Sequence, residues 1–321
     1  MICTTANGNR KHERRFLTAS AVRTSSALIL LAALINCSLF AQTKVNRPRL
    51  LGIAHVALYV SDLGKARAFY EDFLGFAEPF SLKQQDGTDW ISVIKVNDRQ
   101  YLELFPGNTQ SGGQLSHIAL YTDDVVGMRN YLLSCGVKVP QQVHKGQAGD
   151  SFFTVSDPDG HLIEIVQYAA DSQTATAAGK SMPLSRVSSH ISHVGLLVGQ
   201  AAAAMKFYGD ILGLREIWRG AEGGKQVSWI DMRVPDGTDY VEFMLYQDSP
   251  SLEQRKLQNH IGFASADVQK TVQVLQSQSA ANSYSRSIDI QSWVNGKRVT
   301  NLFDPDGARM EIMESQIADG K

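Results

Sequence analysis

Short apolar runs rich in β-branched residues recur along this chain, and each is followed by a segment whose apolar residues have helical spacing. Residues 56–60 form the first such run. The apolar positions that follow it recur every 3.6 residues, as on one face of a helix; they are Ala66, Phe69, Tyr70, Phe73 and Leu74. Ser61 or Asp62 can cap the start of this helix, and Gly75 can close its end. The pattern predicts a strand followed by a helix.

The same strand and helix pattern recurs, each time opened by a histidine. It begins at His55 and again at His193, and shorter echoes of it begin at His117 and His260. Internal repeats of this kind take priority over other signals of fold. The chain is therefore predicted to contain four strand-helix-strands units that pair into two domains. The predicted class is α+β, with two tandem domains.

The domain boundaries follow from the repeat and from composition. The first domain is predicted to span 51–168 and the second 190–315. The residues between them, 169–189, are rich in Ala, Ser, Thr and Gln and have no apolar periodicity, so they are predicted to form the linker. Within the first domain a helix is predicted over 125–134. A hairpin is predicted to follow it, with Asp157-Pro-Asp-Gly160 as its turn.

The first 41 residues differ from the rest of the chain. Basic residues precede the apolar stretch Ala27–Ile35, and a possible cleavage site follows at Ala41. This layout is typical of a secretory signal peptide, and the apolar stretch is shorter than the ~20 residues that a membrane span needs. The mature protein is therefore predicted to be exported, periplasmic or extracellular, without a membrane anchor. Outside this leader only Cys135 remains of the three cysteines, so no internal disulfide is expected.

Composition and charge narrow the possible partners. The chain has 321 residues, of which 43% are hydrophobic and 20% charged, and its formal net charge is −1. These values are ordinary for a globular protein of about two domains. The chain has no basic stripe of the kind that binds nucleic acid. A nucleic-acid partner is therefore not expected.

Each half carries two histidines and two glutamates at matched positions of the repeat, all within predicted strands. They are His55, Glu103, His117 and Glu164 in the first half, and His193, Glu242, His260 and Glu311 in the second. Two imidazoles and two carboxylates suit a divalent Zn, Ni, Co, Mn or Fe(II) ion. If all four bind, an octahedral ion keeps two positions for water or substrate.

One such residue alone would indicate little, because a single strand histidine or glutamate is commonly a satisfied polar residue or a solvent-facing one. Eight acid or imidazole residues at matched repeat positions are much harder to attribute to chance. A buried carboxylate without a partner is strongly unfavourable, and a metal ion supplies that partner. The sequence therefore predicts two metal sites, one for each half.

The chain resembles the vicinal oxygen chelate superfamily, which includes glyoxalase I, extradiol dioxygenases, methylmalonyl-CoA epimerase and bleomycin resistance proteins. The resemblance rests on the helix endings 69–75 and 207–213, each Phe-Tyr-x-x-x-Leu-Gly, and on the Asp-Pro-Asp-Gly-x-x-x-Glu segments ending at Glu164 and Glu311. It implies paired βαβββ modules whose curved sheets enclose a cleft. It also implies that the His/Glu/His/Glu sets are metal ligands. The sequence does not decide whether each site forms within one domain or from residues of both domains.

The resemblance to glyoxalases implies a reaction type. A small substrate with two adjacent oxygens would chelate the metal, which acts as a Lewis acid and stabilises an enediolate. A coordinated glutamate, Glu164 or Glu311, would detach and move a proton as general base. Tyr59 and Leu197 stand where bacterial glyoxalase I has an arginine that helps to bind glutathione, which disfavours lactoylglutathione as the substrate.

Two alternatives compete with this reading. The first is a ring-cleaving dioxygenase that uses Fe(II), with His193, His260 and Glu311 as ligands. Against it, Glu242 stands where those enzymes commonly have a catalytic histidine, and Asn301 stands where they have a tyrosine. The second is a non-catalytic protein whose cleft sequesters a small molecule, as resistance proteins do.

Overall fold

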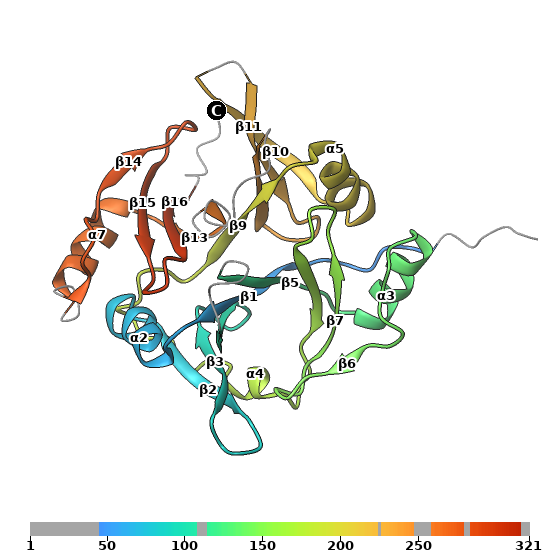
Figure 1. Cartoon of the computed structure of the whole chain (residues 1–321), viewed down its shortest axis with the longest axis horizontal. Helices are drawn as coiled ribbons and strands as arrows, with labels where there is room; N and C mark the ends of the chain where they lie inside the picture. Colours follow the sequence, from blue (N-terminus) through green and yellow to red (C-terminus); the bar gives the residue numbers. More distant parts are fainter. Residues whose placement is uncertain (1–44, 108–113, 224–225, 247–257, 279–282, 316–321) are drawn as a thin grey trace, which may run out of the picture. The chain divides into compact units, whose positions relative to one another are not determined.

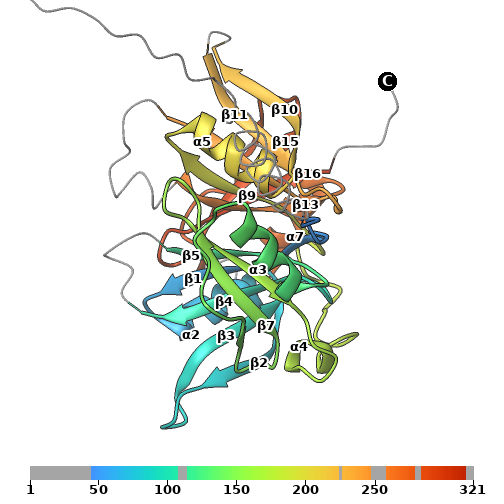
Figure 2. The same cartoon turned by 90° about the vertical axis from the view of Figure 1, so that its right-hand side faces the viewer.

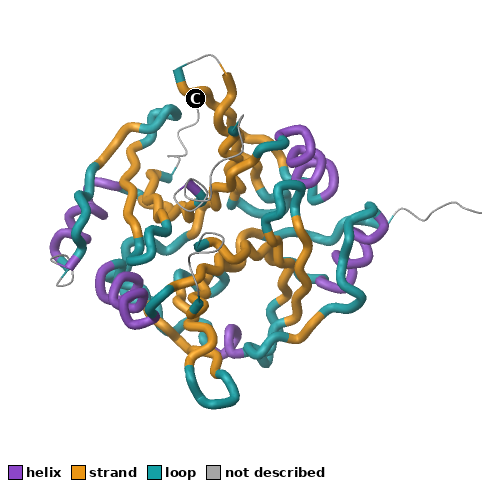
Figure 3. Tube along the Cα trace, in the orientation of Figure 1, coloured by secondary structure: helices purple, strands orange, loops and turns teal. Residues whose placement is uncertain are grey.

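A computed structural model describes residues 45–107, 114–223, 226–246, 258–278 and 283–315 (Figure 1). The predicted leader, residues 1–41, lies outside this range. Strands hold more of the described residues than helices do, and helices lie at the periphery of the strands (Figure 3). Among the described residues, no helix combines the length and the apolar character that a membrane crossing requires.

The first half forms an eight-stranded sheet in the order β2-β3-β4-β1-β5-β8-β7-β6. Its strands are β1 (Gly52–Val60), β2 (Ala77–Lys83), β3 (Asp89–Lys95), β4 (Tyr101–Pro106), β5 (Leu115–Tyr121), β6 (His144–Lys145), β7 (Ser151–Ser156) and β8 (Leu162–Gln167). Its helices are α2 (Leu63–Arg67), the π-helix η1 (Ala68–Phe73) and α3 (Val125–Ser134). A short helix, α4 (Gln173–Thr176), lies in the segment predicted to be the linker.

The second half forms an eight-stranded sheet of the same order, β10-β11-β12-β9-β13-β16-β15-β14. Its strands are β9 (Ile191–Val198), β10 (Arg215–Glu222), β11 (Gln226–Arg233), β12 (Tyr240–Leu245), β13 (His260–Ser265), β14 (Ile290–Ser292), β15 (Arg298–Phe303) and β16 (Arg309–Glu314). Its helices are α5 (Ala201–Ala204), the π-helix η2 (Met205–Ile211) and α7 (Val268–Ser277).

Each sheet consists of two βαβββ modules joined side by side. In the first module β1 pairs in parallel with β4, and in the second β5 pairs in parallel with β8. The two modules meet where β1 and β5 pair antiparallel. The second sheet repeats this arrangement, with β9 parallel to β12, β13 parallel to β16, and β9 antiparallel to β13. The α+β fold of two tandem domains with paired βαβββ modules is therefore confirmed.

The first helix begins and ends where the sequence predicts, but its second half is wider than an α-helix. Asp62 caps the start, because its side chain accepts a hydrogen bond from the backbone N–H of Lys65 at 3.0 Å. Gly75 closes the end with φ +75°, a left-handed conformation that glycine adopts at little cost. Between them the chain widens into η1, which was not predicted; the aromatic residues of this segment, Phe69, Tyr70 and Phe73, remain buried together.

The strands separate two environments because successive side chains point to opposite faces of a sheet. On β4, Leu102 and Leu104 are buried in the main core, whereas Glu103 between them lines a cavity. The helices cover the core face of the sheets; α3 packs on β7 and β8 (Figure 2), and α7 packs on β15 and β16. The opposite face of each sheet carries the four predicted site residues.

Two matching hydrogen bonds link the domains. The hydroxyl of Tyr70 in η1 donates to Asp304 Oδ2 at 3.1 Å, and the hydroxyl of Tyr208 in η2 donates to Asp157 Oδ2 at 3.0 Å. Tyr70 and Tyr208 occupy equivalent positions of the repeat, as do Asp157 and Asp304. Each of the two aspartates opens an Asp-Pro-Asp-Gly turn. The helix of each domain is thereby tied to a turn of the other.

Candidate functional site

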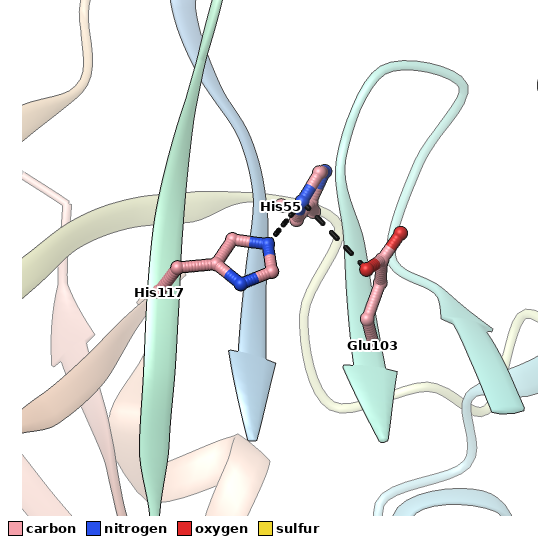
Figure 4. A group of neighbouring side chains, drawn as sticks. All are labelled: His55, Glu103 and His117. Atoms are coloured by element: carbon pink, nitrogen blue, oxygen red, sulfur yellow. Dashed lines mark hydrogen bonds and ion pairs between the residues drawn. The ribbon is translucent and has the colours of Figure 1, made fainter. Parts of the chain in front are cut away.

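Three neighbouring strands bring His55, Glu103 and His117 together (Figure 4). His55 comes from β1, Glu103 from β4 and His117 from β5. The Nε2 atoms of His55 and His117 lie 2.9 Å apart, and Glu103 Oε2 lies 3.8 Å from His55 Nε2. These donor atoms form a compact group that could hold a metal ion.

Glu164 on β8 completes the first quartet. Its two carboxylate oxygens lie 3.5 Å from His55 Nε2 and 3.7 Å from His117 Nε2. All four predicted residues of the first half therefore converge on one point, and all four belong to one domain. The question whether sites form within a domain or across domains is thus answered for this quartet: it forms within the domain.

The second quartet repeats the arrangement on β9, β12, β13 and β16. His193 Nε2 and His260 Nε2 lie 3.1 Å apart. Glu311 lies 3.6 Å from His193 Nε2 and 3.9 Å from His260 Nε2, and Glu242 lies 3.6 Å from His260 Nε2. This quartet also forms within a single domain.

The donor spacings suit a divalent ion. Imidazole nitrogens and carboxylate oxygens bind such ions at about 2.0–2.2 Å, so adjacent ligands lie about 3 Å apart and opposite ligands about 4 Å apart. The separations between donor atoms in the first quartet, 2.9 to 3.8 Å, fall in this range. Those in the second, 3.1 to 3.9 Å, do so as well. Distance alone therefore does not distinguish the two.

Burial sets the charge of the donors. It lowers the pKa of His55 to about 3 and that of His117 to about 4, and the charge of His55 adds to the lowering for His117. Both rings are therefore neutral at pH 7 and keep a lone pair for a metal. Burial raises the pKa of Glu103 and raises that of Glu164 well above its usual range. A cation at this point would offset the cost of ionising both carboxyls.

A cavity of about 310 Å³ opens directly onto the first quartet. All four donor residues line it, and the rest of its wall is largely apolar and aromatic. The aromatic side chains are Phe80, Trp90, Tyr101, Phe105, Phe152 and Tyr168. A few convergent polar groups in an apolar cleft are typical of a small-molecule site.

The second quartet has neighbours that the sequence analysis missed. Arg309 on β16 donates a hydrogen bond to Nδ1 of His260. The charges of Arg309 and Lys297 act on both Glu242 and Glu311, and Asp231 adds a third carboxylate. Arg309 could have been found from the sequence, because it lies two residues before Glu311 and so faces the same side of the strand.

Glycines also distinguish the second quartet. A Cβ atom at Gly195 would lie 2.0 Å from Cε1 of His260, and one at Gly262 would lie 1.9 Å from Cε1 of His193. Alanines, Ala57 and Ala119, occupy the matching positions of the first sheet. The imidazoles of His193 and His260 can therefore lie where they do only because the residues facing them are glycines. Both imidazoles are fully buried.

Comparison with known families confirms the resemblance seen in the sequence. The family model of the Glyoxalase/Bleomycin resistance protein/Dioxygenase superfamily matches residues 52–165 and 190–312. The chain therefore belongs to this superfamily, with one matching stretch in each half.

Individual relatives cover several activities. The "probable lactoylglutathione lyase" of Vibrio parahaemolyticus is 26% identical over 123 residues, which is 36% of this chain and 89% of that protein. The 2,3-dioxygenase LapB of Pseudomonas sp. KL28 has a TM-score of 0.63 at 15% identity, covering 86% of this chain and 97% of that one. The Mn(II)-bound glyoxalase of Novosphingobium aromaticivorans has a TM-score of 0.61 at 20% identity, covering 83% of each chain. The likeness to the two solved structures shows the fold.

Proposed function

We propose that this protein is a divalent-metal-dependent enzyme of the superfamily, which acts in its first domain on a small substrate with two adjacent oxygens. The reaction we favour is a glyoxalase-like proton transfer. The observation that carries the proposal is the convergence of His55, Glu103, His117 and Glu164 at the wall of a cavity of about 310 Å³. The same cavity gives a substrate direct access to the donors.

In this proposal His55, His117 and Glu103 hold the metal, and Glu164 both binds it and moves a proton. The bound ion would supply Lewis-acid chemistry to a substrate that reaches it through two oxygens. Glu164 suits the base because its carboxyl lies within 3.7 Å of both imidazoles and lines the cavity. Without a metal, burial raises the pKa of this carboxyl. Glu311 is the alternative base if the second domain acts instead.

The cavity wall indicates the kind of substrate. Trp90 and Phe105 meet edge to face with ring centroids 6.4 Å apart, and Tyr101 packs on Tyr168 at 6.4 Å. These rings offer an apolar surface on which the carbon skeleton of a substrate can lie. We therefore propose a substrate with an apolar body and one polar, metal-chelating end.

Hydrogen–deuterium exchange tests the reaction type without knowledge of the substrate. The Zn-loaded protein is incubated in D2O with a panel of α-hydroxy ketones, and loss of the proton beside the carbonyl is followed by NMR. We expect catalysed exchange for at least one member and its loss in Glu164→Gln. No exchange with any member, despite full metal loading, would contradict the proton-transfer role.

Ring cleavage is the second candidate, favoured by the convergence of His193, His260 and Glu311 as a two-histidine, one-carboxylate group. Such a group is typical of non-haem Fe(II) oxygenases. Oxygen consumption by the Fe(II)-loaded protein with catechols would favour this candidate. Exchange without oxygen uptake would favour the first.

Export remains a separate proposal. It is supported by the basic residues that precede the apolar stretch Ala27–Ile35. The mass of the intact protein purified from its native cells tests it. A mass that lacks residues 1–41 is expected, and a mass that includes Met1 in the cytosolic fraction would contradict export.

A further inference from the structure

The cavity at the first quartet has an open end and a closed end. Alternate residues of β8 and of the chain just after it line the cavity in turn; they are Leu162, Glu164, Val166 and Tyr168. Leu162 is 44% exposed, whereas Val166 is 3% exposed. Glu164, a predicted metal ligand, therefore lies between an exposed part of the cavity wall and a buried one.

Strand β4 gives the cavity the same direction. Phe105, Glu103 and Tyr101 line it in turn, and such alternate residues of a strand lie ~7 Å apart. The ring of Phe105 meets that of Trp90, which is 43% exposed, with 6.4 Å between the centroids. At the other end Tyr101 is 3% exposed, and its ring lies 6.4 Å from that of Tyr168. The two strands therefore agree that the closed end lies at these two tyrosines.

Residues 169–179, which lie within the predicted linker, cover this closed end. The backbone N–H of Gln173 donates to the carbonyl of Ala148 at 2.8 Å. The hydroxyl of Tyr101 lies 3.5 Å from the carbonyl oxygen of Thr174. Thr174 and Ala148 both line the cavity, and the side chain of Thr174 is buried. The short helix α4 therefore supplies part of the cavity wall, beyond the quartet as seen from the open end.

Two buried charged side chains hold this segment against the first domain. Asp150 Oδ1 accepts a hydrogen bond from the backbone N–H of Ala169 at 2.8 Å, and its Oδ2 accepts one from the hydroxyl of Thr174 at 2.5 Å. The ammonium of Lys95, whose side chain is fully buried, donates to the carbonyl of Ala177. Hydrogen bonds to charged groups are stronger than those between neutral groups. The segment is therefore a fixed wall of the cavity.

The hydroxyl groups at the closed end already have partners in the protein. That of Tyr168 donates to the carbonyl of Arg99 at 2.8 Å, and that of Thr174 donates to Asp150. A ligand that reaches this end therefore meets the ring of Tyr168, the side chain of Val166 and the methyl group of Thr174. Such a surface gives a polar group no partner, whereas it stabilises an apolar group by removing it from water.

We propose that the apolar body of the substrate points from the first quartet toward the closed end of the cavity, and that Thr174 limits its length. This inference rests on the proposed metal site of the first domain and adds the direction and the size of its substrate. The cavity of about 310 Å³ has room for roughly ten non-hydrogen atoms, at the ~30 Å³ that one water molecule occupies in the liquid. Because the chelating end takes part of this room, the body is a short alkyl chain or a single ring.

Binding of alkyl hydroxamates to the Mn2+-loaded full chain tests the inference without turnover. A hydroxamate offers two adjacent oxygens to a metal, and its alkyl chain can be lengthened by one methylene at a time. Affinity is measured from the change in water-proton relaxation as the hydroxamate displaces water from the bound Mn2+. We expect the affinity to rise about threefold per methylene until the closed end is filled, and then to fall. Thr174→Ser removes one methyl group and keeps the hydroxyl, so it should move this length limit by about one methylene.

Thr176→Ala is the matched control, because Thr176 lies in the same helix, is exposed and is not part of the cavity wall. It should leave the length limit unchanged, and far-ultraviolet circular dichroism confirms that each variant is folded. An affinity that keeps rising with chain length would overturn the inference while leaving the metal site intact. So would a limit that is the same in Thr174→Ser as in the wild type, or one that moves equally in Thr176→Ala. Failure to bind Mn2+, or failure of the Mn2+-loaded chain to bind any hydroxamate, would overturn the proposed function itself.

Discussion

Tyr70 of the first domain donates to Asp304 of the second, and Tyr208 donates to Asp157 in return. The framework of the two domains therefore matches down to single hydrogen bonds. The residues around the two quartets differ: Leu162 lies beside His117, whereas Arg309 lies beside His260. A duplicated framework can thus carry donor sets of identical composition in different electrostatic settings. The neighbours of a donor set decide its chemistry as much as the donors do.

The largest effect expected from this difference is on turnover. Glu164→Gln removes the proposed base of the open cleft and should slow the exchange of substrate protons at least ~100-fold, as loss of a general base commonly does. Glu311→Gln, at the matching position of the second quartet, should slow it less than ~3-fold. The rate of proton exchange in each variant is measured by NMR at saturating metal concentration. Equal losses would mean that both clefts act or that neither assignment is right.

A smaller effect is expected on stability, to which the two interdomain tyrosines should contribute unequally. Tyr70→Phe leaves Asp304 Oδ2 without its tyrosine donor and should lower the free energy of unfolding by about 2 kcal/mol. Tyr208→Phe should cost about half as much, because His161 Nδ1 still lies 2.8 Å from Asp157 Oδ2. Denaturant titrations measure both values. A larger loss for Tyr208→Phe would contradict the supporting role of His161.

A pH-dependent effect on stability is expected from Asp231, beside the second quartet. Burial raises the pKa of Asp231 to about 7, with Glu311 adding to the rise and Lys297 opposing it. A carboxyl whose pKa is higher in the folded than in the unfolded state costs stability as the pH rises from the unfolded value through the folded one. Asp231→Asn should therefore stabilise the protein by about 1 kcal/mol at pH 8 and have little effect near pH 4.

Val93 occupies the position in the first domain that Asp231 has in the second, since the two pair with Glu103 and Glu242. Val93→Asn serves as the matched control. It puts an amide into a buried apolar position and should destabilise the protein equally at both pH values. Thermal unfolding at the two pH values measures both variants. A stabilisation by Asp231→Asn that does not depend on pH would contradict the assigned titration.

The smallest expected effect is the release of protons on metal binding. Burial raises the pKa of Glu103 and Glu164 and so favours their protonated forms, whereas a metal binds the ionised forms. Calorimetric titrations with Mn2+ in buffers of different ionisation enthalpy should show a release of protons that grows as the pH is lowered from 8 to about 6. Uptake of protons would contradict the direction of these pKa shifts.

Much of the fold could be predicted from the sequence, because the repeat shows the same order of strands and helices in both halves. The helix predicted over 125–134 is α3, Val125–Ser134, and Asp62 caps the first helix as expected. The π-helices could not be predicted in the same way, since the spacing of Phe69, Tyr70 and Phe73 also satisfies an α-helix. In the structure the π-helical segment contacts the other domain through Tyr70 and Asp304, and the hydrophobic pattern does not show this contact.

The donors could also be predicted, but their setting could not. Matched histidines and glutamates identify the quartets, and the structure brings each of them together. The charge of Lys297 acts on the second quartet from a turn between strands, and Asp231 lies on β11, opposite Glu242 of β12. Such contacts depend on sheet register and on curvature, which hydrophobic pattern alone does not specify.

The most direct test of the account is the position of a bound metal. Crystals grown with Mn2+ would be measured at a wavelength where manganese scatters anomalously. The account predicts one strong peak among His55, Glu103, His117 and Glu164, at about 2.0–2.2 Å from their donor atoms. A peak found only among His193, Glu242, His260 and Glu311, or no peak in either quartet, would contradict it.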